Sequence, residues 1–227
     1  MLRLRNLAFD LLFYLGSVPL ILTALFESML SQAGLARGSR RWSRYFLWCA
    51  RVVLGIRYQV SGALPQHCCI VAMKHQSMFE AIALLTLFDY PAVVMKAELM
   101  RIPGWGHLAR RHGSIPVARE ASARALRQMM AAADAACAEG RPIVIFPEGT
   151  RGHGDEPQSF KSGLFKLAQM FPQVVLVPAW INNVQRVMPK GEVVPVPILC
   201  SVTFGAPIAL EAGEDVALGV LEGAPAG

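Results

Sequence analysis

The sequence Ile70-Val-Ala-Met-Lys-His-Gln-Ser-Met-Phe-Glu80 joins two contrasting patterns. Residues 68–73 are uniformly apolar and predict a short buried strand. Residues 79–88 are rich in Ala and Leu and predict a helix. The polar residues between them therefore lie at a strand-to-helix junction. In α/β sheets the carboxyl ends of strands are where ligands bind.

Three polar residues at this junction form a pattern of their own. Ser77 can cap the helix, and Glu80 then stands where the carboxylate of a capping box would stand. On a continuous helix His75 and Glu80 would point about 140° apart. If His75 lies just outside the helix, its ring can fold back onto the carboxylate and keep one ring nitrogen for accepting a proton. The alternative is a helix cap beside a histidine that lines the sheet edge.

Three further segments carry a resemblance to a known family. They are Lys96-Ala-Glu-Leu-Met-Arg-Ile-Pro-Gly-Trp-Gly106, Gly113-Ser-Ile-Pro-Val-Ala-Arg119 and Phe146-Pro-Glu-Gly-Thr-Arg151. With the His75 segment, they resemble the motifs of the glycerolipid acyltransferases, in particular the 1-acyl-glycerol-3-phosphate (lysophosphatidate) acyltransferases. The resemblance covers roughly half of the chain in order and approximate spacing. Glu80 replaces the family's usual Asp, and Lys74 replaces its usual Asn.

This resemblance implies transfer of a fatty acyl group from a thioester to the free hydroxyl of a lysophospholipid, giving phosphatidic acid. His75 is the expected base and Glu80 its orienting carboxylate. No metal or other cofactor is required, because the acyl-CoA or acyl carrier protein thioester is already activated. The expected substrate-binding residues are Arg119, Glu148, Gly149, Thr150, Arg151, Lys96 and Lys161.

The residue types suit these roles. An Arg such as Arg151 can grip a phosphate in fork geometry, and Gly149 lets the backbone turn and approach a ligand closely. Lys161 opens an expected helix, whose N-terminus attracts phosphate. The alternatives are a β-turn with a surface Arg and a surface Lys. Glu148 is expected to position Arg151 or to accept from the glycerol hydroxyls.

Three other functions are compatible with parts of this pattern. One is acylation of another lysolipid, because Lys74 and Glu80 depart from the commonest pattern. Another is a non-catalytic membrane lipid-binding protein of the same fold, against which the intact His75, Glu80 and Arg151 argue. A hydrolase is disfavoured because the chain has no Gly-x-Ser-x-Gly elbow.

Apolar and Ala-rich segments alternate along most of the chain. This predicts an α/β fold with a largely parallel β-sheet flanked by helices, preceded by an N-terminal membrane-associating helical segment. We expect that segment at residues 1–55, an acyltransferase catalytic domain at 56–210 and a loosely ordered tail at 211–227. Strands are expected at 56–60, 68–73, 92–96, 114–117, 142–146, 174–179 and 193–204. Helices are expected at 79–88, 106–111, 120–139 and 161–170.

The apolar run at residues 7–30 raises the question of a membrane. As one helix it would reach about 36 Å, enough to cross a bilayer core, although Gly16-Ser-Val-Pro19 predicts a kink. One interpretation is a tilted spanning helix. The other is a helical hairpin, with residues 37–54 as its second arm, that dips into one leaflet. An apolar stripe at 40–54 between arginines is typical of an interfacial helix, and packing in the core is the alternative.

The charge of the chain is concentrated near its start. Residues 1–60 hold eight Arg and two acids, whereas the remainder is neutral. A basic segment beside an apolar helix suits anionic membrane phospholipids, and the positive-inside tendency predicts the cytoplasmic face of a membrane. Nucleic acid is disfavoured as a partner because no nucleic-acid motif occurs. The five cysteines include no Cys-x-x-Cys pair, which predicts reduced thiols. The histidines and cysteines are not spaced as metal ligands, so a zinc site is not expected.

Overall fold

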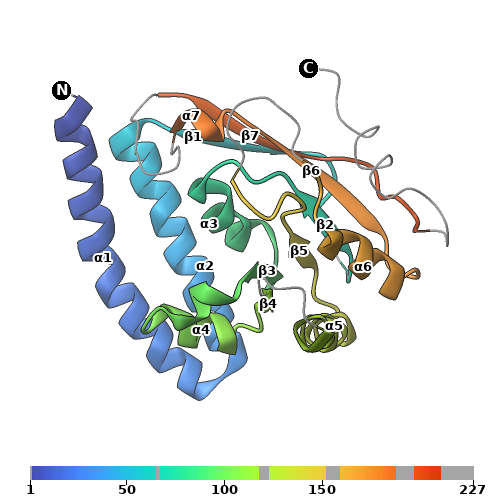
Figure 1. The fold of residues 1–227 in the computed structure, drawn as a ribbon. Helices are drawn as coiled ribbons and strands as arrows, with labels where there is room; N and C mark the ends of the chain where they lie inside the picture. The colour runs from blue at the N-terminus through green and yellow to red at the C-terminus, as the bar shows by residue number, and fades with distance from the viewer. Residues whose placement is uncertain (1, 65–66, 118–122, 152–158, 188–196, 211–227) are drawn as a thin grey trace.

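The computed structural model describes residues 2–64, 67–117, 123–151, 159–187 and 197–210 (Figure 1). The expected tail at 211–227 lies outside these ranges. The strands are β1 (Arg57–Ser61), β2 (Ile70–Met73), β3 (Ala92–Lys96), β4 (Ile115–Val117), β5 (Ile143–Ile145), β6 (Leu176–Asn182) and β7 (Leu199–Phe204). The helices are α1 (Leu2–Leu30), α2 (Gln32–Cys49), α3 (Met78–Leu87), α4 (Trp105–Arg111), α5 (Ala123–Ala138), α6 (Ser162–Met170) and α7 (Val184–Val187). A π-helical turn η1 (Ala50–Leu54) follows α2, and a 3-10 turn η2 (Ala97–Arg101) follows β3.

The seven strands form one sheet in the order β1-β7-β6-β2-β5-β3-β4. The five strands from β6 to β4 pair in parallel. β7 runs antiparallel to β6, and β1 runs parallel to β7. The expected α/β fold with a largely parallel sheet is therefore confirmed. The carboxyl ends of the five parallel strands share one edge with the amino ends of β1 and β7.

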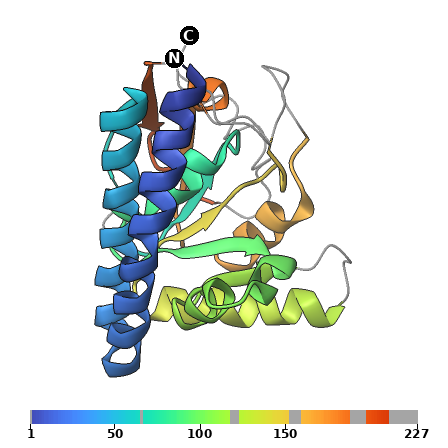
Figure 2. The same ribbon diagram turned by 90° about the vertical axis from the view of Figure 1, so that its left-hand side faces the viewer.

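Side-chain alternation along β2 divides the core between the two faces of the sheet. Val71 and Met73 face α3 and the N-terminal helices, whereas Ile70 and Ala72 face α5 and α6. All four residues are buried, as expected for a central parallel strand that is covered on both sides. Figures 1 and 2 show α1 and α2 as an outer layer on one side of the molecule.

The N-terminal helices α1 and α2 pack side by side as a hairpin (Figure 2). Ser31 makes the turn, and its hydroxyl accepts a hydrogen bond of 3.0 Å from the Gly34 amide, which caps α2. Pro19 lies inside α1, and the helix continues through it. The structure contains a helical pair, whose second arm begins at Gln32 instead of residue 37.

The apolar stripe of α2 was expected to lie at a lipid interface, and for most of its residues this is wrong. Phe46 and Cys49 are buried in the main core. The Trp42 indole donates a hydrogen bond of 3.0 Å to the Ser17 hydroxyl. The reason is that α1 covers this stripe and supplies its apolar partner. The exposed apolar residues lie mainly on α1 and include Leu4, Leu7, Leu11, Leu15, Val18, Leu22, Phe26 and Met29.

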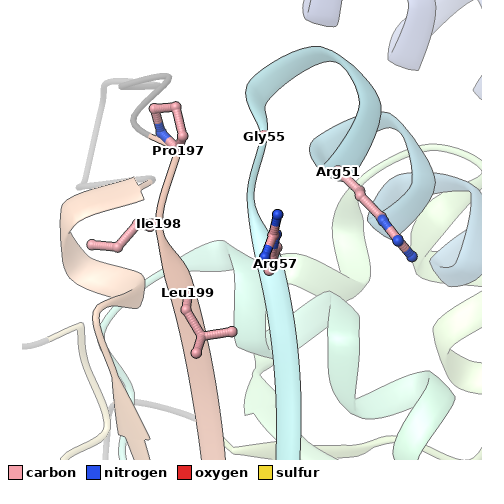
Figure 3. A pocket seen from close by; sticks show the side chains of 6 residues that line it. All are labelled: Arg51, Gly55, Arg57, Pro197, Ile198 and Leu199. Atoms are coloured by element: carbon pink, nitrogen blue, oxygen red, sulfur yellow. The ribbon is translucent and has the colours of Figure 1, made fainter.

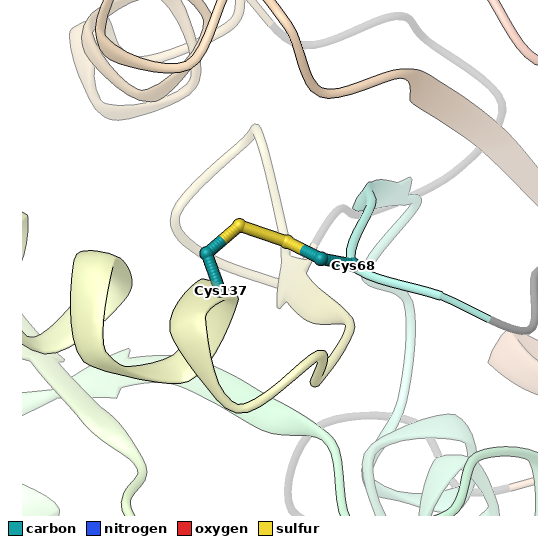
Figure 4. Close-up of a disulfide and its surroundings, with 2 residues drawn as sticks. All are labelled: Cys68 and Cys137. Atoms are coloured by element: carbon teal, nitrogen blue, oxygen red, sulfur yellow. A yellow bond between two sulfur atoms is a disulfide. The ribbon is translucent and has the colours of Figure 1, made fainter.

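A disulfide joins Cys68, just before β2, to Cys137 near the end of α5 (Figure 4). The expectation of reduced thiols is therefore wrong for these two residues. The two cysteines are 69 positions apart in the sequence, and they meet because the end of α5 lies beside the amino end of β2. The other three cysteines are free and buried: Cys49, Cys69 and Cys200.

Candidate active site

His75 lies between β2 and α3, at the strand-to-helix junction that the sequence predicts. Ser77 caps α3 with extended backbone, and its hydroxyl accepts a hydrogen bond of 3.1 Å from the Phe79 amide. The carboxylate of Glu80 accepts from the Ser77 amide at 2.6 Å, so the capping box is present. The helix therefore begins after His75, which leaves the His75 ring free to turn toward Glu80.

The ring does meet that carboxylate. His75 Nδ1 lies 2.9 Å from Glu80 Oε1, and the Glu80 side chain is fully buried while that of His75 is 20% exposed. The same oxygen accepts from the Gln76 amide at 2.7 Å. A histidine that donates from Nδ1 keeps Nε2 as an acceptor, so the geometry leaves one ring nitrogen able to accept a proton, as a general base requires.

The Phe146 motif reaches His75 from the neighbouring strand. Phe146 follows β5, which pairs with β2, and its ring stacks on the His75 imidazole at 4.2 Å between centroids. Glu148 accepts a hydrogen bond of 3.3 Å from the His75 amide. Burial raises the pKa of Glu148, although the His75 amide and the Lys74 ammonium oppose the rise. This motif therefore fixes both the ring and the backbone of His75.

These contacts differ from one of the two roles expected for Glu148, which was to position Arg151. Its hydrogen bond in the structure is to the His75 amide, and none joins it to Arg151 among the described residues. Sequence reasoning missed this contact and the Phe146 stacking. Phe146 and Glu148 both follow β5, so knowing that β5 pairs with β2 would have predicted these contacts. The order of strands in the sheet cannot be read from a short segment of sequence.

The remaining residues of the motif form a turn beside His75. Gly149 has φ of 66°, in the left-handed region that favours glycine, as its expected role requires. Thr150 is exposed and Arg151 is half-buried. The Lys161 amide donates 2.8 Å to the Pro147 carbonyl, so exposed Lys161 lies beside the same turn. Two of the expected phosphate-binding cations thus lie at or beside this turn.

The two other expected cations are placed differently. Lys96 ends β3 and is half-buried, at the same sheet edge as His75 but two strands away. Arg119 lies outside the described residues. Across those residues, no group of three or more His, Cys, Asp or Glu side chains could hold a metal ion.

A groove of about 560 Å³ opens at the same edge, at the amino ends of β1 and β7 (Figure 3). Its lining consists of Arg51, Gly55, Arg57, Pro197, Ile198 and Leu199. The Arg5 guanidinium lies beside it and donates to the Val53 carbonyl at 2.9 Å. The groove therefore combines exposed positive charge with apolar walls.

Residues 55–182 match the family profile described as Acyltransferase. The chain belongs to this acyltransferase family. The matched segment runs from the end of η1 to the end of β6, so it includes His75, Glu80 and the Phe146 loop.

Named relatives agree with this assignment. The chain is 36% identical over 114 residues to the 1-acyl-sn-glycerol-3-phosphate acyltransferase of Pseudomonas aeruginosa, covering 49% of this chain and 44% of that protein. Its namesake in Helicobacter pylori is 27% identical over 72% of this chain and 74% of its own length. A lyso-ornithine lipid O-acyltransferase of Rhizobium meliloti is 30% identical over 57% of this chain and 44% of that protein.

A solved structure shares the fold. The crystal structure of the 1-acyl-sn-glycerophosphate (LPA) acyltransferase of Thermotoga maritima superposes with a TM-score of 0.79 at 24% identity, over 98% of this chain and 94% of that one. This likeness extends over the N-terminal hairpin as well as the sheet.

Proposed function

We propose that this chain transfers a fatty acyl group from an acyl thioester to the free hydroxyl of 1-acyl-glycerol-3-phosphate, giving phosphatidic acid. The observation that carries the proposal is the His75–Glu80 pair, held at 2.9 Å at the carboxyl edge of the sheet. The names of the Pseudomonas and Helicobacter relatives support the choice of acceptor.

In the proposed reaction His75 Nε2 accepts the proton of the acceptor hydroxyl while the oxygen attacks the thioester carbonyl carbon. Glu80 stabilises the imidazolium that forms. The tetrahedral intermediate collapses, the carbon–sulfur bond breaks, and the leaving thiolate takes the proton from His75. The thioester is already activated, so these steps need no cofactor. Acyl-CoA and acyl carrier protein carry the same thioester, and both are proposed donors.

A second acceptor follows from the Rhizobium relative, which by its name acylates a lyso-ornithine lipid. The two proposals differ in the acceptor headgroup, because only lysophosphatidate carries a phosphate for a cation to bind. Purified protein in detergent, given labelled acyl-CoA and a panel of lysolipids, distinguishes them. Acylation of lysophosphatidate alone supports the first proposal, and acylation of lyso-ornithine lipid alone supports the second.

Arg151 is the cation we assign to the acceptor phosphate, because it is half-buried on the turn beside His75. Arg151→Ala is expected to raise KM for lysophosphatidate by roughly 10- to 100-fold, since a charge-assisted hydrogen bond is lost in ground and transition states alike. Neutral lysolipids should change little. Steady-state kinetics with both kinds of acceptor measures this difference.

Arg127→Ala, an exposed arginine on α5, is the matched control and should leave KM unchanged. If Arg151→Ala keeps the normal KM for lysophosphatidate, another group holds the phosphate. Lys161, Lys96 and Arg119 are then the residues to test.

We further propose that the N-terminal hairpin holds the protein on the cytoplasmic face of a membrane. One helix in the described residues, Leu4–Leu30 within α1, is long and apolar enough to cross a bilayer, and only 22% of its most apolar window is buried. Arg51 and Arg57, which line the groove in Figure 3, lie where the hairpin leads into β1. They suit the phosphates of anionic lipids.

Replacing Arg51 and Arg57 together by Ala is therefore expected to weaken binding to anionic vesicles by about 30-fold, since each charge contributes on the order of 1 kcal/mol at such a surface. Flotation with phosphatidylcholine vesicles, with and without phosphatidylglycerol, measures the change. Neutral vesicles should bind both proteins equally. Arg124→Ala with Arg127→Ala, on α5, is the control pair, and an equal loss in that pair contradicts the assignment.

A further inference from the structure

Glu80 has a second oxygen that the catalytic pair does not use. Oε1 accepts from the His75 ring and from the Gln76 and Ser77 amides, at 2.9, 2.7 and 2.6 Å. Oε2 is buried without a hydrogen-bond partner among the described residues. A buried carboxylate oxygen that lacks a donor destabilises the folded protein, so a donor for this oxygen is expected nearby.

A matching donor is buried in the same layer. The hydroxyl of Tyr58 is also buried without a hydrogen-bond partner in the described part of the chain. Tyr58 lies on β1, and its ring packs edge-on against Phe79 at 5.6 Å between centroids. Phe79 immediately precedes Glu80 in α3. Two buried polar groups of complementary kind thus lie on the same side of the sheet, one an acceptor and one a donor.

The charge of the Glu80 carboxylate acts on the titratable groups of this part of the sheet. Burial raises the pKa of the Tyr58 hydroxyl far above its ordinary value, and the Glu80 carboxylate is the second cause. Cys200 lies opposite Tyr58 in the pairing of β1 and β7. Burial, and after it the Glu80 carboxylate, raises the pKa of Cys200 to about 12. Tyr58 therefore stays protonated near neutral pH and can donate.

We propose that Tyr58 is a positioning residue for acyl transfer: in the working enzyme these two groups, which have no partner within the described ranges, meet, and the Tyr58 hydroxyl donates to Glu80 Oε2 and so holds the carboxylate that orients His75. The inference rests on the proposed function. With donors on both oxygens, the carboxylate cannot rotate to exchange them, and its charge is shared between the two ends. Glu80 then presents Oε1 to His75 in one fixed orientation.

Tyr58→Phe removes only the hydroxyl and keeps the ring against Phe79. The expected result is a kcat lower by about 10- to 100-fold with KM little changed, because a hydrogen bond to a charged group is lost. The acid limb of the kcat/KM profile should move to higher pH, because a carboxylate with one donor fewer attracts the proton on His75 more strongly. Tyr45→Phe, which removes a hydroxyl bonded to the Leu12 carbonyl on the hairpin, should change neither.

Two further measurements separate positioning from packing. In a Glu80→Ala background, Tyr58→Phe should cost less than twofold in kcat, because the group through which it acts is gone. In the wild-type background, Tyr58→Phe should lower Tm, because Glu80 Oε2 loses its donor. If the Tyr58 hydroxyl had no partner, removing it would instead raise Tm.

The inference is overturned if Tyr58→Phe lowers kcat by the same factor in both backgrounds, or if its Tm rises. The Nδ1–H proton resonance of His75 is a readout that needs no substrate. It should shift in Tyr58→Phe and not in Tyr45→Phe, and an unchanged resonance also overturns the inference. A wild-type chain that acylates no lysolipid contradicts the proposed function, while Tm and the resonance still judge the role of Tyr58.

Discussion

His75→Ala is expected to lower kcat for acyl transfer by roughly 10²–10⁴-fold, the range typical of a removed general base. The His75 ring lies 2.9 Å from the buried Glu80 carboxylate and stacks on Phe146, so its position is set before the substrate binds. A base acts mainly in the transition state, when the hydroxyl proton leaves. KM for the lysolipid should therefore change little.

The measurement is steady-state kinetics on a variant shown by circular dichroism to be folded. His107→Ala, an exposed histidine on α4, is the matched control and should keep the normal rate. A His75→Ala protein with near-normal kcat would show that another group takes the proton.

Loss of the Cys68–Cys137 disulfide is expected to lower the free energy of unfolding by roughly 4 kcal/mol, because the bond closes a long loop in the unfolded chain. The two residues are 69 positions apart. For a chain of this size, such a loss corresponds to a fall in Tm of about 8–16 °C. Thermal unfolding in mild detergent, with and without dithiothreitol, measures it.

A double variant in which Ser replaces both Cys68 and Cys137 provides the control. Its Tm should match that of the reduced wild type and should not respond to dithiothreitol. Because Cys49, Cys69 and Cys200 are buried free thiols, they should not contribute to the reductant effect. If dithiothreitol leaves the wild-type Tm unchanged, the prediction is contradicted.

The sequence predicts the local parts of the site well. Ser77 and Glu80 are three positions apart, so the capping box depends only on one turn of helix. His75 stands just before that turn, and its contact with Glu80 follows from where the helix begins. The alternation of apolar and Ala-rich segments likewise predicts the α/β class, because strand and helix periods are properties of short windows.

The N-terminal hairpin shows where local reasoning stops. The apolar runs predict two helical arms, but whether the stripe of α2 meets lipid or protein depends on what packs against it. In the structure α1 covers Phe46 and Cys49, and the exposed apolar face lies on α1 instead. Apolar composition alone does not distinguish the two surroundings, because lipid and a protein core both favour the same side chains.

The sequence by itself therefore determined the junction, the His75–Glu80 pair and the fold class, because each depends on residues within a few positions of one another. Only the tertiary structure decided that Phe146 stacks on His75, that Glu148 accepts from its amide and that Tyr58 packs against Phe79, the residue before Glu80. The physical reason is the order of the strands. These contacts join β5 and β1 to the β2–α3 junction, and pairing between distant strands is set by the burial of the whole sheet, which no short segment encodes.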